Sequence, residues 1–129
     1  MEFNYNRYHS NMIRSCRKSP IPAIICADGF KISVQASDYA YCEPRVKDAF
    51  YTLVEAGYPS ELPSVLSEYA ETPDTTETVF GWVPVGIINR LIDSHGGIRK
   101  EDEHWLLAHI NMDEDISFAE EEAIYMWDR

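Results

Sequence analysis

The most regular alternation of apolar and polar residues runs over residues 30–37, with the sequence FKISVQAS. Successive side chains of a strand point to opposite faces, so this pattern predicts a strand with one face in the core and one in water. The apolar run at residues 23–26 precedes it. The pair Asp28-Gly29 between them predicts a tight hairpin turn, because glycine accepts a positive φ without penalty. Two further strands, rich in aromatic and β-branched residues, are predicted at residues 50–56 and 78–83.

The spacing of apolar residues changes to that of a helix over residues 84–95. Apolar side chains three and four apart line one face of this helix: Val85, Ile88, Leu91 and Ile92. The run His95-Gly96-Gly97 predicts that it ends in a left-handed C-cap. Residues 60–71 predict a shorter helix with Pro63 in its first turn and one buried side. The apolar residues of that side are Leu62, Val65, Leu66 and Tyr69.

The two ends of the chain carry weaker patterns. Residues 1–20 are polar with little periodicity, which predicts an irregular N-terminal arm. Residues 104–112 are apolar enough for either a strand or a helix. Ser117 and Glu120 form a capping box for a last helix over residues 118–127.

Together these elements predict a single α+β domain over residues 1–129. Its core, at residues 21–98, is a small antiparallel sheet of three to five strands with two or three helices packed on it, the helix at residues 84–95 on one face. Residues 99–129 form an acidic C-terminal segment.

Charge is divided unevenly along the chain. Residues 1–50 hold seven Lys/Arg and five Asp/Glu, whereas residues 51–129 hold four and seventeen, and the whole chain carries -11. Such a chain repels nucleic acid and anionic membranes and favours basic partner surfaces. There is no apolar run of membrane-spanning length and no signal-peptide pattern at the N-terminus, so we expect a soluble protein that stays inside a cell.

Residues that could carry chemistry are not spaced as catalysis or metal binding requires. The three cysteines lack the C-x-x-C spacing of a zinc site and do not form an even disulfide set, which favours a reducing cytosol: Cys16, Cys26 and Cys42. The four histidines lack the spacing of a two-ligand helical site and are expected to be structural: His9, His95, His104 and His109. No calcium-loop or phosphate-binding glycine pattern is present. We therefore expect no catalytic residues, no metal and no cofactor.

Residues 37–45 (SDYAYCEPR) gather phenols, a thiol, a carboxylate and a guanidinium that a turn does not need. Tyrosine and arginine are enriched at interface hot spots, because they bury area while keeping a polar group. The candidate binding residues here are Tyr39, Tyr41, Glu43 and Arg45. Tyr51 and Tyr58 would extend this face, or the tyrosines would form an edge of the core.

An alternative use of the same segment is a pocket for a small ligand or for catalysis around Tyr39, Tyr41, Cys42 and Arg45. In that case Arg45 would lower the pKa of the Cys42 thiol. The sequence places no general base beside it.

The acidic residues of the C-terminal segment are a second candidate surface. They would keep the domain soluble, or they would imitate a phosphate backbone and occupy a groove meant for nucleic acid. The candidates are Glu101, Asp102, Glu103, Asp113, Glu114, Asp115, Glu120, Glu121 and Glu122.

Three segments together resemble a family of small bacteriophage proteins without assigned function: ADGFKISVQASDYAYCEPR at residues 27–45, VEAGYPS at 54–60 and VFGWVPVGIINRLIDSHGGI at 79–98. The resemblance covers residues 27–98. It implies a phage or prophage origin and action in the host cytoplasm, and it carries over no catalytic residues. Small acidic phage proteins often inhibit host machinery, as anti-CRISPR proteins do, so such a role follows by analogy.

We therefore expect a non-enzymatic, phage-encoded binding protein that inhibits a host defence complex through an acidic protein-binding or nucleic-acid-mimicking surface. Its partner would be a host protein or nucleoprotein complex with a basic surface, with no direct contact to nucleic acid or membrane. The alternatives are the small-ligand pocket described above and a structural or assembly role in the virion.

Overall fold

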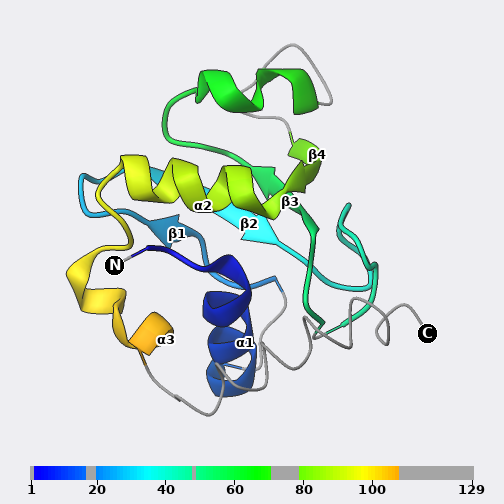
Figure 1. Cartoon of the computed structure of the whole chain (residues 1–129), viewed down its shortest axis with the longest axis horizontal. Coiled ribbons are helices and arrows are strands. Elements are labelled where there is room, and N and C mark those ends of the chain that lie inside the picture. The colour runs from blue at the N-terminus through cyan, green and yellow to red at the C-terminus, as the bar shows by residue number, and fades with distance from the viewer. Residues whose placement is uncertain (1, 17–19, 48, 71–78, 108–129) are drawn as a thin grey trace.

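The computed structural model describes residues 2–16, 20–47, 49–70 and 79–107 (Figure 1). It contains an antiparallel four-stranded sheet in the order β1-β2-β3-β4, with helices around it. The predicted α+β class is therefore confirmed. The strands are β1 (Ile24–Ile25), β2 (Lys31–Gln35), β3 (Leu53–Gly57) and β4 (Val79–Pro84). The α-helices are α1 (Tyr5–Cys16), α2 (Val85–Ser94) and α3 (His104–Leu107), and the 3-10 helices are η1 (Ser64–Tyr69) and η2 (Lys100–Asp102).

The predicted hairpin joins β1 to β2 through a three-residue loop at residues 27–29. The Cys26 N–H donates to the Phe30 carbonyl at 2.8 Å, and Gly29 adopts a φ of 98°. Asp28 closes the turn, since its Oδ1 accepts the Phe30 N–H at 2.9 Å. In β2, Ile32 and Val34 are buried and Lys31 is exposed, so the predicted alternation is confirmed.

Helix α2 begins directly after β4, with Pro84 as its N-cap. Its buried residues are Ile88, Leu91 and Ile92, with Val85 half-buried, so the predicted apolar face is confirmed. The helix ends in the predicted left-handed cap: Gly96 and Gly97 have φ values of 90° and 82°, and the Gly97 N–H donates to the Ile92 carbonyl at 3.0 Å.

The N-terminal segment is not the irregular arm that its polar sequence predicts. Residues 5–16 form helix α1, capped by Asn4, whose Oδ1 accepts the Arg7 N–H at 3.1 Å. Helix α1 buries apolar and polar side chains together: Tyr5, Tyr8 and Met12 form a short apolar stripe, and Asn6, His9, Ser10 and Asn11 are also buried. Asn6, His9 and Asn11 bind backbone carbonyls of other elements, so polar residues extend the buried face beyond the apolar stripe.

Asn6 shows how a polar side chain of this face is buried without leaving polar groups unpaired. Its Nδ2 donates to the Tyr51 carbonyl at 3.0 Å, and its Oδ1 accepts the Tyr51 N–H at 2.8 Å. The side-chain amide thus pairs with Tyr51 as a neighbouring strand would. Helix α2 holds the start of the same segment in a similar way. Its Asn89 and Asp93 side chains accept the backbone N–H groups of Tyr5 and Phe3.

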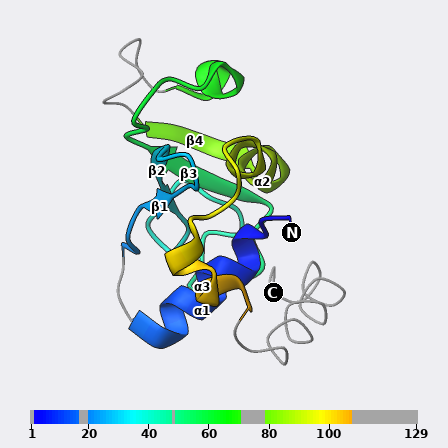
Figure 2. The ribbon, with the colours of Figure 1, turned by 90° about the vertical axis from the view of Figure 1, so that its left-hand side faces the viewer.

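One hydrophobic core joins the sheet, α1, α2 and α3. It extends beyond residues 21–98 on both sides, from Phe3 to Leu106. Figures 1 and 2 both show α3 beside α1, with η1 at the opposite end of the molecule.

Other elements differ from the sequence-based expectations in extent or type. The third strand is shifted to Leu53–Gly57 from residues 50–56. In place of the helix expected at residues 60–71 there is a shorter 3-10 helix, η1. Leu66 in η1 is buried, but Val65 in η1 and Leu62 before it are 54% and 48% exposed. Residues 104–107 of the ambiguous segment are helical, and the rest of it lies outside the described residues, as does the helix expected at 118–127.

Candidate functional site

Residues 37–45 leave the end of β2 and are anchored on β3 and β4. The Tyr41 N–H donates to Oε1 of Glu55 in β3 at 2.8 Å, and the Trp82 N–H of β4 donates to the Tyr41 carbonyl at 3.0 Å. Glu43 forms a single antiparallel bridge with Leu53. These backbone contacts fix the segment, although it has no regular secondary structure.

Tyr41 and Trp82 form an aromatic pair on the surface, with ring centroids 4.8 Å apart and planes 15° apart. The Arg45 guanidinium lies over the Tyr41 ring, with Cζ 5.3 Å from its centroid, and it donates to the Tyr39 carbonyl at 2.9 Å. Tyr39 itself is 82% exposed. We call Tyr39, Tyr41, Arg45 and Trp82 the aromatic surface.

Trp82 lies at a β-bulge. Val54 pairs with Val83 and Ala56 with Phe80, so Gly81 and Trp82 stand together opposite Glu55. Trp82 has a φ of 50°, in the left-handed region, which costs a side-chain-bearing residue about 1–2 kcal/mol. Bulges of this kind redirect a side chain and occur next to binding sites. The indole is nevertheless 43% exposed, so core packing alone does not account for its placement.

Of the residues singled out in this segment, the structure brings together Tyr39, Tyr41 and Arg45, and it adds Trp82, which sequence reasoning missed. The sequence did contain a signal for the bulge at Trp82: Gly81 lies inside a predicted strand, and an isolated glycine in a strand is typical of a bulge. Glu43 is exposed and joins β3 through its backbone. Tyr51, by contrast, belongs to the core, with its hydroxyl donating to the Val46 carbonyl at 2.7 Å. Tyr58 is exposed beyond the other end of β3 and is not part of the aromatic surface.

The expectation of a lowered pKa for the Cys42 thiol is wrong: Arg45 does lower it, but burial raises it more. Cys42 is 1% exposed, and its Sγ lies 3.1 Å from the Ser37 carbonyl, to which it donates. Burial raises the pKa of this thiol, and the opposing effects of the Ser37 hydrogen bond and of Arg45 are smaller. Burial also raises the pKa of Cys26, to about 12. Both thiols are therefore protonated at neutral pH, which is unfavourable for a nucleophile.

The acidic candidates that the structure describes lie on η2 and at its end, on the side of the molecule opposite residues 37–45 (Figure 1). Glu101 is exposed, and Asp102 accepts a 2.7 Å hydrogen bond from Nε of Arg99. Glu103 is half-buried and lines a cavity. The remaining acidic candidates lie outside the described residues: Asp113, Glu114, Asp115, Glu120, Glu121 and Glu122.

The histidines that interact within the described chain have structural partners. Nε2 of His9 lies 2.9 Å from the Ala36 carbonyl in the core. Nδ1 of His95 lies 2.7 Å from Oδ2 of Asp28, and its ring stacks on Phe30 at 4.1 Å. The pKa of the Asp28 carboxyl is lowered, first by the hydrogen bond from the Phe30 N–H and then by His95.

No group of three or more histidine, cysteine, aspartate or glutamate side chains among residues 2–16, 20–47, 49–70 and 79–107 is arranged to hold a metal ion. Over the same part of the chain, no helix has the length and apolar character needed to cross a membrane.

No protein-family model matches this chain, and neither curated proteins nor solved structures show significant similarity to it. The candidate site therefore has to be interpreted from its own geometry.

Proposed function

We propose that this chain is a non-enzymatic binding protein that docks on a partner protein through the aromatic surface. The observation that carries the proposal is Trp82, which is held at a β-bulge with a φ of 50° while its indole remains 43% exposed. If Trp82 served only to fill the core, we would expect its side chain to be buried and its backbone to be unstrained. A role in binding explains the strain, because the bulge presents the indole beside Tyr41.

The composition of the aromatic surface supports a protein partner. Tryptophan, tyrosine and arginine are the residues most enriched at interface hot spots. The Tyr41–Trp82 stack and the Arg45 contacts hold three of the four side chains in place before binding. A preorganised surface loses less side-chain entropy on association and therefore binds more tightly.

The charge of the chain argues for a basic partner. Aromatic platforms that stack nucleic-acid bases lie in positively charged grooves, because the phosphates must be neutralised. This chain carries a net charge of -11, which would repel a polyanion over long range. The same charge attracts a protein with a positive rim around an apolar pocket, into which Trp82 and Tyr39 would insert.

The more specific form of the proposal is an inhibitor of a host defence complex, acting in the host cytoplasm after expression from a phage. It is supported by the resemblance of residues 27–98 to small phage proteins and by the acidity of the chain. In this form, the aromatic surface covers a functional face of a basic nucleoprotein machine.

Capture from cells tests the proposal. A photo-crosslinking amino acid at the exposed position 46, next to Arg45, would be introduced into the tagged chain with its aromatic surface intact, into Trp82→Gly and into Arg90→Ala. Arg90 is an exposed cation on α2, outside the aromatic surface, and serves as the matched control. We expect one basic protein to be crosslinked by the native chain and by Arg90→Ala, and lost with Trp82→Gly. Equal crosslinking by all three chains would show that the aromatic surface does not select a partner.

A further inference from the structure

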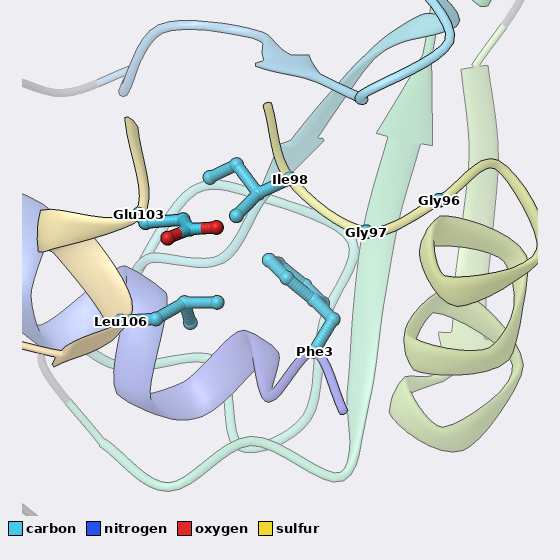
Figure 3. A pocket seen from close by; sticks show the side chains of 6 residues that line it. All are labelled: Phe3, Gly96, Gly97, Ile98, Glu103 and Leu106. Carbon is cyan, nitrogen blue, oxygen red and sulfur yellow. The ribbon is translucent and has the colours of Figure 1, made fainter. Parts of the chain in front are cut away.

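A cavity of about 120 Å³ lies where the N-terminal segment, the chain after α2 and the start of α3 meet (Figure 3). It is on the η2 side of the molecule, away from the aromatic surface (Figure 1). Its lining residues are Phe3, Gly96, Gly97, Ile98, Glu103 and Leu106.

The lining of this cavity is divided about equally between polar groups and apolar side chains that belong to the core. Phe3, Ile98 and Leu106 are all buried, and Figure 3 shows their side chains pointing toward one another. A Cβ atom added to Gly97 would meet nothing within 4 Å, so the backbone leaves that side open. For comparison, an engineered protein cavity of about 150 Å³ that is lined by leucine, isoleucine and phenylalanine binds benzene. This one therefore has room for a short alkyl chain.

One charged group faces the same space. The Glu103 carboxylate points between Ile98 and Leu106 (Figure 3). No described residue donates a hydrogen bond or forms an ion pair with it, whereas the neighbouring Asp102 is bound by Arg99 at 2.7 Å and Asp93 by the Phe3 N–H at 2.8 Å. A half-buried carboxylate without a partner is stabilised by a cation that brings its own donors.

We propose that this cavity receives a lysine side chain of the partner protein, with the alkyl stem against Phe3, Ile98 and Leu106 and the ammonium group on Glu103. Lysine buries its methylene stem while placing a compact charge at the end, which matches a cavity that combines apolar core side chains with a carboxylate. Arginine fits less well, because its planar guanidinium is wider than an ammonium group and pairs best with a carboxylate that accepts two parallel hydrogen bonds.

This proposal depends on the proposed function in one respect only, namely that the lysine belongs to the partner protein. The affinity of the cavity for the side chain can be measured without any partner. The probes are N-acetyl-lysine methylamide, its norleucine counterpart, which has the same stem without the charge, and the arginine counterpart. We expect the lysine probe to shift the amide NMR signals of Gly96, Gly97 and Ile98 at millimolar concentration, and to bind at least about tenfold more tightly than the norleucine probe.

Two isosteric variants separate a specific site from general acidity. Glu103→Gln keeps the shape of the side chain, and no described hydrogen bond is lost, so the fold should be retained. Lysine affinity should fall about tenfold. Glu101→Gln removes an exposed charge two residues away and should bind the lysine probe as the native chain does.

Several results would overturn the lysine site: equal binding of the norleucine or arginine probe, equal losses in the two variants, or no shifts at Gly96–Ile98. The aromatic surface is tested independently, because Trp82→Gly should bind the lysine probe normally. Failure of the lysine site alone would therefore leave the proposed function standing, and loss of partner crosslinking alone would leave the lysine site standing.

Discussion

At the residue scale, the positive φ of Trp82 leads to an unusual prediction about the relative stability of two variants at this position. Glycine inside a strand is normally less stable than alanine by about 0.5–1 kcal/mol. At position 82 the order should reverse, because alanine keeps the strained φ of 50° and glycine relieves it. Both variants lose the Tyr41 stack equally.

Urea unfolding of the two variants measures this difference. We expect Trp82→Gly to be more stable than Trp82→Ala by about 1 kcal/mol. The usual order, with alanine the more stable, would mean that residue 82 does not have a positive φ in solution.

The two glycines after α2 give a second prediction at the residue scale. Both have a positive φ, but a Cβ on Gly96 would lie 3.0 Å from the Cβ of Ala27, whereas a Cβ on Gly97 meets nothing within 4 Å. Gly97→Ala should therefore cost only the backbone strain, about 1–2 kcal/mol. Gly96→Ala should cost more, because the hairpin loop at Ala27 must also move. Thermal unfolding of both variants measures the difference, and equal losses would show that α2 and the hairpin are not in close contact.

At the element scale, α1 depends on polar contacts that can be removed one at a time. Asn6→Ala would leave the buried N–H and carbonyl of Tyr51 without their partner, at a cost of about 2–4 kcal/mol. Gln35 makes the same two-bond contact with the backbone of Ile21, but it is only half-buried.

Gln35→Ala is therefore the matched control. Water can replace its bonds, and we expect a loss of about 1 kcal/mol or less in urea unfolding. An Asn6→Ala variant as stable as Gln35→Ala would show that α1 is not docked on residue 51.

The β1–β2 hairpin should carry an acid-dependent part of the stability. Hydrogen bonds from the Phe30 N–H and His95 lower the pKa of Asp28 in the folded state. A lowered carboxyl pKa adds stability that is present above the unfolded-state value of about 3.9 and is lost as pH falls through the folded-state pKa. Asp28→Asn removes this ionisation.

The free energy of unfolding of both chains, measured from neutral pH to about pH 2, tests this linkage. The native chain should still be more stable than Asp28→Asn at about pH 4, and this advantage should shrink as the pH falls further. An advantage that stays constant through acid pH would show that Asp28 is not held by its partners in the fold.

The elements that the sequence predicts well are those with local signals. The Asp28-Gly29 turn, the alternation of β2 and the glycine-capped α2 each depend on residues within a few positions of one another. Helix α1 has a weaker local signal, because its apolar residues Tyr5, Tyr8 and Met12 are interspersed with polar residues that read as surface residues until their distant backbone partners are known. The same limit applies to the candidate site: Tyr39, Tyr41 and Arg45 stand out by composition, but the pairing with Trp82 depends on a bulge between two strands.

At the scale of the whole molecule, residues 37–45 and η2, which carry two distinct surfaces, lie on opposite sides of the molecule (Figure 1). The aromatic surface offers hot-spot side chains, and the cavity beside Glu103 offers an anchor for a lysine. A partner that contacts both must wrap around the molecule or bind two copies of it. The net charge of -11 would speed its approach at low salt and do so less as salt is added.

The most direct test of the central claim uses the partner protein that crosslinking identifies, purified on its own. Its dissociation constant is measured with the native chain, with Trp82→Gly and with Val65→Ala. Val65 is an exposed apolar residue on η1, outside the aromatic surface. The account predicts that Val65→Ala binds as the native chain does, and that Trp82→Gly, although folded, binds about 30-fold or more weakly, the loss typical of a hot-spot residue. A folded Trp82→Gly chain with native affinity would contradict it.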